Sequence, residues 1–544
     1  MSQAEIAHMN GLNQGREAAA SKLIWWQTGL IYQVYPRSFA DSNGDGVGDL
    51  PGIRQKLDYL AWLGVNALWI SPVYPSPMAD HGYDVSDYTG IHPLFGTLAD
   101  MAALIEDAHQ RGLKVILDFV PNHTSSEHPW FIESKSSRTN PKRDWYLWAD
   151  PKPDGSPPNN WLSVFGGPGW TWSESTGQYY CHAFLKEQPD LNWRNPEVRA
   201  AMYEAMRVWL ERGVDGFRVD VLWHLIKDAA LRDNPENPHY TPDQTPYNSL
   251  LPVYSTDQPE VHEIVREMRA LVDRYSERVL IGEVYLPIHQ LVSYYGPEQN
   301  GAQLPFNFQL ITLPWNARQI AAAISEYEGA LPLNAWPNWV LGNHDQPRIA
   351  SRVGLAQARV AAILLLTLRG TPTLYYGDEI GMRDGVITPE QAQDPQGKNV
   401  GLSRDPQRTP MQWSNEPAAG FTSGQPWLPI GIDAARRNVE AQRAEPDSML
   451  GLYRRLIALR DKEPALHRGA YVPFPAHGDI LAYFREFADN KYLIVLNLGH
   501  RSQFFPIGEL RGQIVVASER LREGQVVSGG VALTGDDGMV IRVS

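Results

Sequence analysis

Short apolar runs alternate with stretches of helical periodicity along most of this chain, and this alternation restricts the possible folds more than any other feature. Eight runs have the composition of buried strands, at 31–35, 67–70, 115–120, 214–220, 279–284, 304–310, 339–342 and 373–376. Helical stretches separate them, at 51–63, 98–111, 196–211, 261–275, 318–327 and 355–368. Strands that alternate with helices form parallel sheets, and eight such units close into a barrel. The sequence therefore predicts an α/β fold with a (β/α)8 TIM barrel.

Other segments interrupt or follow the alternation. Residues 121–190 are rich in Pro, Gly, Trp and Ser and are too long for a plain loop, so we expect an inserted domain B after the third strand. Residues 233–257 form a Pro- and Asn-rich, lid-like excursion. Short β-like runs after residue 464 predict a C-terminal antiparallel β domain, a β-sandwich, over 465–544. The remaining parts are a flexible leader and the two segments of the barrel, at 1–20, 21–120 and 191–464.

The composition narrows the classes of partner and the location. The chain has 544 residues and a net charge of −14, which argues against nucleic acid or an anionic membrane as its main partner. No apolar run reaches about 18 residues, and residues 1–20 lack the apolar core of a secretory signal. Cys181 is the single cysteine, which fits a reducing compartment. We therefore expect a cytoplasmic protein with no nucleic-acid and no membrane partner.

The run at 214–220 ends in Asp220, and a helix-like stretch follows it. Such a strand places its last residue at the carboxyl edge of the barrel, where barrel enzymes carry their chemistry. Arg218 lies two residues earlier and therefore points to the same face. A neighbouring guanidinium favours the ionised form of a carboxyl group, and an ionised carboxylate can act as a nucleophile. For this run alone, a structural Asp–Arg pair is an equally good interpretation.

Other strands also end in residues suited to acid–base chemistry. Asp118, Asn122 and His123 follow the third strand, Glu283 follows the fifth, and Asn343, His344 and Asp345 follow the seventh. Cleaving a glycosidic bond requires two carboxyl groups, one to protonate the leaving oxygen and one to attack or to activate water. The set therefore indicates acid–base work on a hydroxylated substrate. A metal site built from His123, His344 and Asp345 is a weaker alternative.

A Gly- and Asp-rich loop at 41–49 has the spacing of a cation site. Acids or Asn stand at its positions 1, 3, 5 and 9, and Gly46 stands at position 6, as in the first part of an EF-hand loop. Position 12 is Gly52 in place of the bidentate Glu. An Asx-rich turn without an ion is the alternative, and no organic cofactor is predicted. We expect a structural Ca²⁺, or Mg²⁺, bound by the side chains of Asp41, Asn43, Asp45 and Asp49 and by the Val47 carbonyl.

Further residues are candidates for the walls of a sugar pocket. Asp80 and Tyr83 lie just past the second strand, where Tyr83 can stack under a sugar ring and Asp80 can accept hydrogen bonds from hydroxyl groups. Phe165 and Phe184 lie within residues 121–190 and can line the same pocket. A generic turn explains the first pair equally well, and core packing explains the second.

Five motifs in this chain resemble the signature regions of the α-amylase superfamily, glycoside hydrolase family 13. Four of them are Asp118-Phe-Val-Pro-Asn-His123, Gly216-Phe-Arg-Val-Asp220, Ile281-Gly-Glu283-Val and Asn343-His-Asp345. The fifth, Gln188-Pro-Asp-Leu-Asn192, has the form typical of the α-glucosidase and oligo-1,6-glucosidase subgroup. The resemblance runs from about residue 25 to the C-terminus, and it implies an exo-acting α-glucosidase with a retaining mechanism.

The resemblance also implies roles for individual residues. By position, Asp220 is the nucleophile, Glu283 is the acid/base and Asp345 is the third carboxylate, which grips the 2- and 3-hydroxyls. Arg218 would keep Asp220 ionised, whereas nearby negative charge would keep Glu283 protonated. The substrate-binding roles fall on His123 and His344 for ring hydroxyls, on Asp80 with Arg408 (or Arg404) for the 4-hydroxyl, on Tyr83 for stacking, and on Phe165 and Phe184 for the pocket wall.

The linkage preference depends on the residue after the nucleophile. Val221 at this place resembles subgroup members that cleave α-1,6 bonds, whereas Thr or a smaller residue resembles α-1,4-restricted members. One methyl-sized change discriminates by about 1–3 kcal/mol. The sequence therefore predicts activity on short α-1,4 and α-1,6 glucosides such as maltose and isomaltose, with transglucosylation as a side reaction.

Two other functions compete with this interpretation. A trehalose synthase, sucrose isomerase or glucosyltransferase would use the same site, but no Arg-Leu-Asp-Arg-Asp run of the isomerase type follows Arg348. A non-catalytic glycan-binding protein or transporter ectodomain would not need three rim acids, and this chain keeps all three. Hydrolysis of short α-glucosides remains the favoured function.

Overall fold

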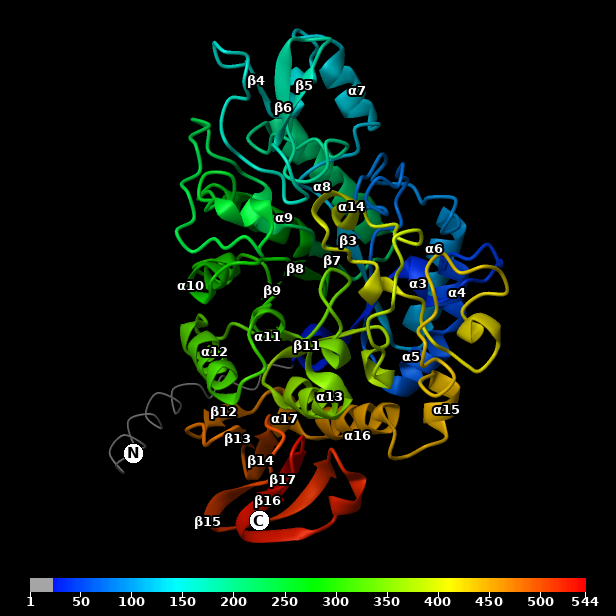
Figure 1. Cartoon of the computed structure of the whole chain (residues 1–544), viewed down its shortest axis with the longest axis vertical. Helices are drawn as coiled ribbons and strands as arrows, with labels where there is room; N and C mark the ends of the chain where they lie inside the picture. Colours follow the sequence, from blue (N-terminus) through cyan, green and yellow to red (C-terminus); the bar gives the residue numbers. More distant parts are fainter. Residues whose placement is uncertain (1–22) are drawn as a thin grey trace.

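The computed structural model describes residues 23–544, which contain a barrel of eight parallel strands (Figure 1). The strands are β1 (Ile31–Val34), β2 (Ala67–Ile70), β3 (Lys114–Phe119), β7 (Gly216–Val219), β8 (Val279–Gly282), β9 (Leu304–Pro305), β10 (Asn338–Val340) and β11 (Thr371–Tyr375). They pair in the order β10-β11-β1-β2-β3-β7-β8-β9. The fold class predicted from the alternation is confirmed, and the predicted leader at 1–20 lies outside the described residues.

The side chain of Asn338 in β10 connects this strand to β9, where the two ends of the barrel sheet meet. Asn338 Nδ2 donates to the Pro305 carbonyl, and Asn338 Oδ1 accepts from the N–H of Asn307 at 2.9 Å. The predicted strand at 304–310 is wrong in length, since β9 ends at Pro305. Asn307 accepts from the N–H of Gln309 at 3.1 Å, and this turn starts helix α11 (Gln309–Thr312) where the strand was expected to continue.

Helices cover the outside of the barrel. They include α4 (Leu50–Gln55), α5 (Leu57–Leu63), α6 (Leu98–Gln110), α8 (Pro196–Glu211), α9 (Val261–Val272), α12 (Ala317–Ala330) and α16 (Met449–Lys462). The prediction for α8 holds at both ends, because Asn195 caps the helix and Pro196 occupies its first turn. The predicted helix at 51–63 is two helices, because Lys56 leaves the helical conformation with φ −101° and ψ 2°.

Helix α13 (Ile349–Thr367) begins six residues before the predicted start at 355. Gly354 interrupts it with φ 79°, a conformation that glycine tolerates, so the first turn and the main helix differ in direction. Within residues 23–544, α13 is the one helix long and apolar enough to cross a membrane, and 61% of its apolar window is buried inside the protein. Packing against α16 and β17 (Gly538–Val543) accounts for this apolar character.

Alternate strand residues fill the barrel in layers. Ile31 and Ile116 belong to the apolar interior cluster, whereas Tyr32 points outward and packs with the helices. Further along the strands the interior becomes polar, and Asp118 pairs in register with Arg218. Because side chains alternate with a period of two, the acid and the guanidinium share the inner face at the carboxyl end of the barrel.

Domain B stands at this same end of the barrel (Figure 1). It contains α7 (Pro129–Ser136) and a three-stranded sheet of β4 (Trp148–Ala149), β6 (Gln178–Cys181) and β5 (Trp170–Ser173). The predicted excursion at 233–257 is bound to domain B. The N–H of Asn160 donates to Asp233 Oδ1, and the N–H of Asn234 donates to Asn160 Oδ1, both at 2.8 Å. The excursion and domain B therefore form one continuous wall.

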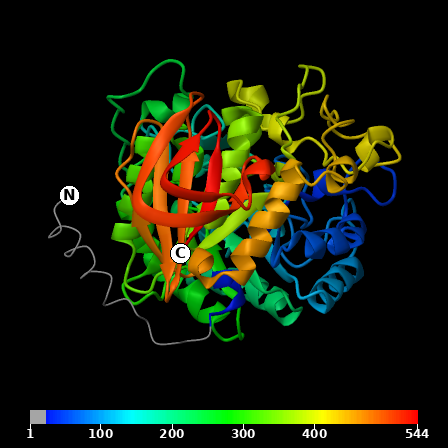
Figure 2. The ribbon, with the colours of Figure 1, turned by 90° about the horizontal axis from the view of Figure 1, so that it is seen from below.

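A six-stranded antiparallel sheet follows the barrel and lies at the opposite end from domain B (Figures 1 and 2). Its strands are β12 (Ala470–Pro473), β13 (Ile480–Phe487), β14 (Asn490–Asn497), β15 (Gln503–Ala517), β16 (Val526–Leu533) and β17. The predicted C-terminal antiparallel β domain is confirmed. Hydrogen bonds join its six strands into one sheet, whereas the predicted β-sandwich would have two. Ile480 lies in the core of this sheet itself, whereas Leu481 joins the barrel's core.

Candidate active site

Arg218, at the carboxyl end of β7, is the centre of three carboxylates. Its Nη1 donates to Asp118 Oδ1 at 2.8 Å and to Asp220 Oδ1 at 2.7 Å. Its Nη2 lies 2.8 Å from Glu283 Oε2. The side chain of Arg218 is fully buried, whereas those of Asp220 and Glu283 keep 9% and 5% exposure. The structure thus gathers three residues predicted for the site around one buried charge.

The residue after Asp220 has a strained backbone. Val221 has φ 37° and ψ 47°, the left-handed conformation that β-branched residues avoid. This turn directs the N–H of Val221 to Glu283 Oε2 at 2.8 Å and the N–H of Leu222 to the Glu283 carbonyl at 3.2 Å. The segment that carries Asp220 therefore also fixes the carboxyl group of Glu283.

Asp220 and Glu283 titrate as a pair. Burial raises the pKa of Asp220, Arg218 opposes this rise, and the charge of Glu283 adds to it. Burial also raises the pKa of Glu283, again opposed by Arg218 and reinforced by Asp345. Nη1 of Arg218 makes a hydrogen bond to Asp220, whereas the contact of Nη2 with Glu283 lacks hydrogen-bond geometry. The guanidinium therefore favours negative charge on Asp220, and the pair keeps a proton to a higher pH than isolated carboxyl groups do.

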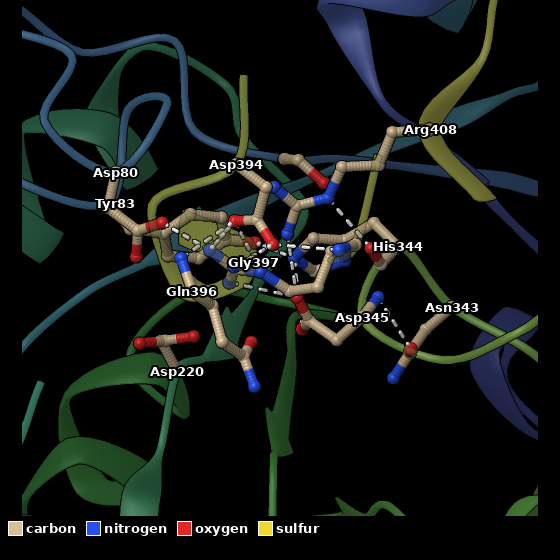
Figure 3. A network of polar contacts seen from close by, with 12 residues as sticks. Asp80, Tyr83, Asp220, Asn343, His344, Asp345, Asp394, Gln396, Gly397 and Arg408 are labelled. Carbon is tan, nitrogen blue, oxygen red and sulfur yellow. Dashed lines mark hydrogen bonds and ion pairs between the residues drawn. The ribbon is translucent and has the colours of Figure 1, made fainter. Parts of the chain in front are cut away.

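Asp345 lies across the site from Asp220 (Figure 3). Its Oδ1 accepts from Arg408 Nη2 at 2.8 Å and from Arg404 Nη1 at 3.3 Å, and its Oδ2 lies 3.2 Å from His344 Nε2. Burial alone would raise the pKa of Asp345, but the neighbouring cations Arg404 and Arg408 hold it below its usual range. Asp345 is thus an anion whose side chain is 25% exposed to the site.

Asp80 pairs with Arg404, the residue that the sequence analysis kept as the alternative to Arg408. Arg404 Nη2 lies 2.6 Å from Asp80 Oδ1 and 2.7 Å from Asp394 Oδ1. Arg408 instead donates from Nε to the His344 carbonyl at 2.8 Å. The place beside Asp80 that was predicted for Arg408 therefore belongs to Arg404.

Burial holds the predicted ring-binding residues in neutral forms, and hydrogen bonds orient them. Tyr83 Oη donates to Asp118 Oδ2 at 3.0 Å and lies 2.8 Å from His344 Nε2, while Gln33 Nε2 lies 2.8 Å from His344 Nδ1. Burial lowers the pKa of His344 well below its ordinary value and that of His123 to about 4. Both histidines are therefore uncharged at neutral pH and suited to hydrogen bonding with hydroxyl groups.

Phe165 and Phe184 lie together at the base of domain B. Their rings meet edge to face with centroids 5.4 Å apart, and Phe184 also lies 5.3 Å from the ring of His123. The Arg404 guanidinium lies 4.7 Å from the centroid of the Phe165 ring. The two predicted wall residues thus join the groups at the rim.

Comparisons with known proteins now identify the family. Residues 33–469 match the model of the alpha amylase catalytic domain, which covers most of the chain. The chain belongs to the α-amylase family. It is 42% identical to a probable alpha-glucosidase of Rhizobium meliloti over 87% of this chain and 89% of that protein. It is 38% identical to an oligo-1,6-glucosidase of Heyndrickxia coagulans over 88% and 93% of the two chains.

Solved structures agree with this membership of the α-amylase family. The alpha-glucosyl transfer enzyme XgtA superposes with a TM-score of 0.91 at 40% identity, over 96% of this chain and 100% of that chain. The trehalulose synthase MutB of Pseudomonas mesoacidophila superposes with a TM-score of 0.88 at 33% identity, over the same shares of the chains. The family and the fold of this α-amylase family member are therefore established, and its exact substrate is a separate question.

The calcium prediction concerns the 41–49 loop, which is separate from the carboxylates around Arg218. Asp41 accepts from the N–H of Gly46 at 2.8 Å, which closes the loop from its first position to its sixth, and Thr422 Oγ1 donates to the same oxygen. The residues described contain no convergent group of three His, Cys, Asp or Glu side chains. His123, His344 and Asp345 accordingly do not form the metal site considered from the sequence. The Ca²⁺ site of the 41–49 loop stays a prediction, with the Asn43 amide and the Val47 carbonyl as further oxygen donors.

Sequence reasoning missed several residues that build the site. Asp394 was not singled out, although an Asp before Pro395 is a helix-start signal, and it caps α14 (Pro395–Val400). Asp190 lies in the fifth motif but was given no role, and its Oδ2 lies 2.7 Å from Lys227 Nζ. This buried pair joins domain B to the segment after β7, and no local pattern predicts it.

Proposed function

We propose that this family member is an exo-acting retaining α-glucosidase that acts on short α-1,4- and α-1,6-linked gluco-oligosaccharides. The observation that carries the proposal is the contact of one buried guanidinium, that of Arg218, with both Asp220 and Glu283. Retention requires two carboxyl groups about 5–5.5 Å apart. The pairing of β7 with β8 puts Asp220 and Glu283 directly after the ends of neighbouring strands. The relatives named alpha-glucosidase and oligo-1,6-glucosidase support the substrate class.

The arrangement suits a two-step reaction. Asp220 attacks the anomeric carbon while Glu283 gives its proton to the leaving glycosidic oxygen, which forms a glucosyl ester and releases the aglycone. Water then gives a proton to Glu283 and attacks the same carbon, which frees Asp220. Asp345, kept anionic by its arginines, hydrogen-bonds two ring hydroxyls more strongly as the ring gains positive charge. An acceptor alcohol in place of water gives a transfer product.

Exo-action follows from the closed end of the site. Asp80 and Arg404 form an ion pair there, and Phe165 packs against the guanidinium. We infer that a glucose unit whose 4-hydroxyl meets this pair would leave no place for a further sugar beyond it. The non-reducing end of the substrate is therefore the part that binds.

Glucose release from maltose and isomaltose tests the proposal. We expect the wild type to hydrolyse both sugars and Asp220→Ala to lose about 10⁴-fold or more in kcat/KM, because no carboxylate remains to form the ester. Asp154→Ala, an exposed acid of domain B, is the matched control and should keep full activity. A folded wild type that cleaves neither sugar would refute the proposal.

A transferase or isomerase function is the second candidate, because XgtA and the trehalulose synthase MutB share this fold over nearly the whole chain. Sucrose supplied at high concentration separates the two. Glucose and fructose as the main products support hydrolysis. Isomerised disaccharides or longer oligosaccharides from the first minutes of reaction would support transfer within the same site.

A further inference from the structure

Arg37 carries a buried positive charge for which residues 23–544 supply no acceptor. It lies in helix α3 (Pro36–Phe39), just after β1, and is 9% exposed. Its Nε atom is buried without a hydrogen-bond partner, and its guanidinium forms neither a hydrogen bond nor an ion pair with the described chain. Burial lowers the pKa of Arg37, and the nearby charge of Arg408 lowers it further, so the surroundings disfavour this charge.

Every other buried arginine in the described part of the chain has acceptors. Carboxylates or backbone carbonyls accept from the guanidinium groups of Arg218, Arg348, Arg404, Arg408, Arg460 and Arg485. A buried charge is strongly destabilising unless it is paired and hydrogen-bonded. The guanidinium of Arg37 therefore indicates an acceptor that does not belong to the protein.

The acids that act on Arg37 from a distance are engaged elsewhere. Asp84 accepts from Ser76 Oγ and from the N–H of Asp80, both at 2.9 Å. Asp45 belongs to the 41–49 loop, where it accepts from the N–H of Val47 at 2.9 Å. Neither carboxylate forms an ion pair with Arg37.

Two more polar side chains join Arg37 at the ring of Trp427. The Arg37 guanidinium is 5.1 Å from the centroid of this ring, and the rings of His81 and Tyr35 have centroids 5.5 Å and 6.4 Å from it. Both ring nitrogens of His81 and the hydroxyl group of Tyr35 are buried without a partner among the described residues. Burial lowers the pKa of His81 well below its ordinary value, and among the nearby charges that of Arg37 has the largest effect. Three unpartnered polar side chains therefore meet at one ring.

The chemistry of these side chains selects the class of ligand. A guanidinium, a phenol hydroxyl and a neutral imidazole each offer at least one hydrogen-bond donor. The guanidinium of Arg408 adds positive charge, 5.3 Å from the centroid of the Tyr35 ring. Asp80, which precedes His81, is already paired with Arg404 at 2.6 Å. Donors and positive charge without a free carboxylate match an anion, and burial favours a monovalent anion, which loses its water more easily than phosphate or sulfate.

We propose that Arg37, Tyr35 and His81 bind a small monovalent anion such as chloride against the ring of Trp427. The anion accepts from the guanidinium, the hydroxyl group and one imidazole nitrogen, and its charge balances that of Arg37. This site goes beyond the proposed α-glucosidase function and does not depend on it.

The proposed anion site lies one layer behind the active site. The Tyr35 ring stacks on the His344 ring with centroids 5.6 Å apart. An anion here would offset the repulsion between the guanidinium groups of Arg37 and Arg408. The bound anion would therefore stabilise the folded protein without contact to the substrate.

Thermal unfolding in sodium chloride and in sodium gluconate of equal ionic strength tests the proposal, with gluconate as the bulky reference anion. The wild-type Tm should be about 1–3 °C higher in chloride and should rise with chloride concentration. Arg37→Gln should remove this dependence. Tyr35→Phe deletes only the hydroxyl group, so the chloride concentration at half effect should rise about two- to tenfold. Arg318→Gln, the same exchange at an exposed arginine, is the matched control and should keep the wild-type response.

A crystal soaked in sodium bromide locates the ion directly, with an anomalous peak expected within hydrogen-bond distance of Arg37 and Tyr35. A wild-type Tm that is equal in both salts, or a chloride response that persists in Arg37→Gln, would overturn the proposal. A bromide peak without a response in solution would mean an adventitious ion only and would overturn it as well. If Arg37→Gln does not fold, Tyr35→Phe decides, because the loss of a purely structural hydroxyl group would lower Tm equally in both salts.

Discussion

The backbone N–H of Val221 donates a 2.8 Å hydrogen bond to Glu283 Oε2 from a left-handed conformation. One turn therefore positions the proposed acid/base and places the buried Val221 directly after Asp220, the proposed nucleophile. Such strain costs about 1–3 kcal/mol and persists where the surrounding structure imposes it. The turn thus links catalytic geometry to substrate choice.

The first prediction concerns linkage preference. Val221→Thr keeps the branched shape, and hence the backbone strain, while it replaces a methyl group by a hydroxyl. We expect the ratio of kcat/KM for maltose over isomaltose to rise about 5- to 150-fold, which corresponds to about 1–3 kcal/mol. Initial rates on both disaccharides measure this ratio, and thermal unfolding serves as the control for the fold. An unchanged ratio in a stable variant would remove Val221 from the determinants of linkage.

The second prediction concerns Asp394, which pairs with Arg404 and caps α14. Asp394→Asn keeps a capping oxygen but removes the negative charge that holds the guanidinium between Asp80 and Asp345. We expect kcat/KM to fall about 10- to 100-fold, with a rise in KM as the larger part. Glu390→Gln, an exposed acid of the same loop, should change neither parameter. Loss of kcat alone would place Asp394 in the chemical step instead.

These two predictions separate what local sequence patterns can predict from what only the folded chain decides. The motif around Asp220 and the strand that ends before Glu283 are local patterns, and the alternation of strands with helices predicts the barrel. The contact of Arg404 with Asp80 joins residues 324 positions apart, and Arg404 lies in a segment without periodicity. Propensity and spacing cannot choose between Arg404 and Arg408 there, because the folded loop alone decides which guanidinium reaches the acid.

The third prediction concerns pH. Glu283 must be protonated to release the leaving group, and burial raises its pKa, so activity should fall as the pH rises through this raised value. Glu283→Gln should abolish this basic limb and lower kcat/KM for maltose about 10²- to 10⁴-fold. With p-nitrophenyl α-glucoside, which needs no acid, the variant should give a rapid burst of nitrophenol and then slow turnover. Glu174→Gln, an exposed acid of domain B, should retain the wild-type profile, and the absence of a burst would contradict the assignment.

The fourth prediction concerns the loop at 41–49, where we propose a structural calcium ion. Asp41 accepts from Thr422, and the N–H of Trp427 donates to the Gly46 carbonyl, so an ion here would stabilise the docking of a distant segment. Removal of calcium with a chelator should lower the free energy of unfolding by about 1–3 kcal/mol, which calorimetry detects as a drop in Tm. Asp45→Ala should abolish the response to calcium. A wild-type Tm that does not respond to calcium or magnesium would show that the loop is an ion-free Asx turn.

The last prediction concerns the buried pair between domain B and the barrel. Lys227 Nζ lies 2.7 Å from Asp190 Oδ2 and donates to Asn122 Oδ1 at 2.7 Å, and Lys227 helps to keep the pKa of Asp190 low against the effect of burial. Lys227→Met leaves a buried carboxylate without its partner, so we expect a loss of about 3–5 kcal/mol at pH 7.5. In the variant the folded pKa of Asp190 rises above its unfolded value. Asp190 then binds a proton more readily in the folded state, and the loss should shrink as the pH falls toward that unfolded value. Denaturant unfolding at pH 7.5 and pH 5 measures this difference. The double variant with Asp190→Asn should recover part of the stability at pH 7.5, and equal losses at both pH values would mean that the pair does not carry the charge that its geometry assigns to it.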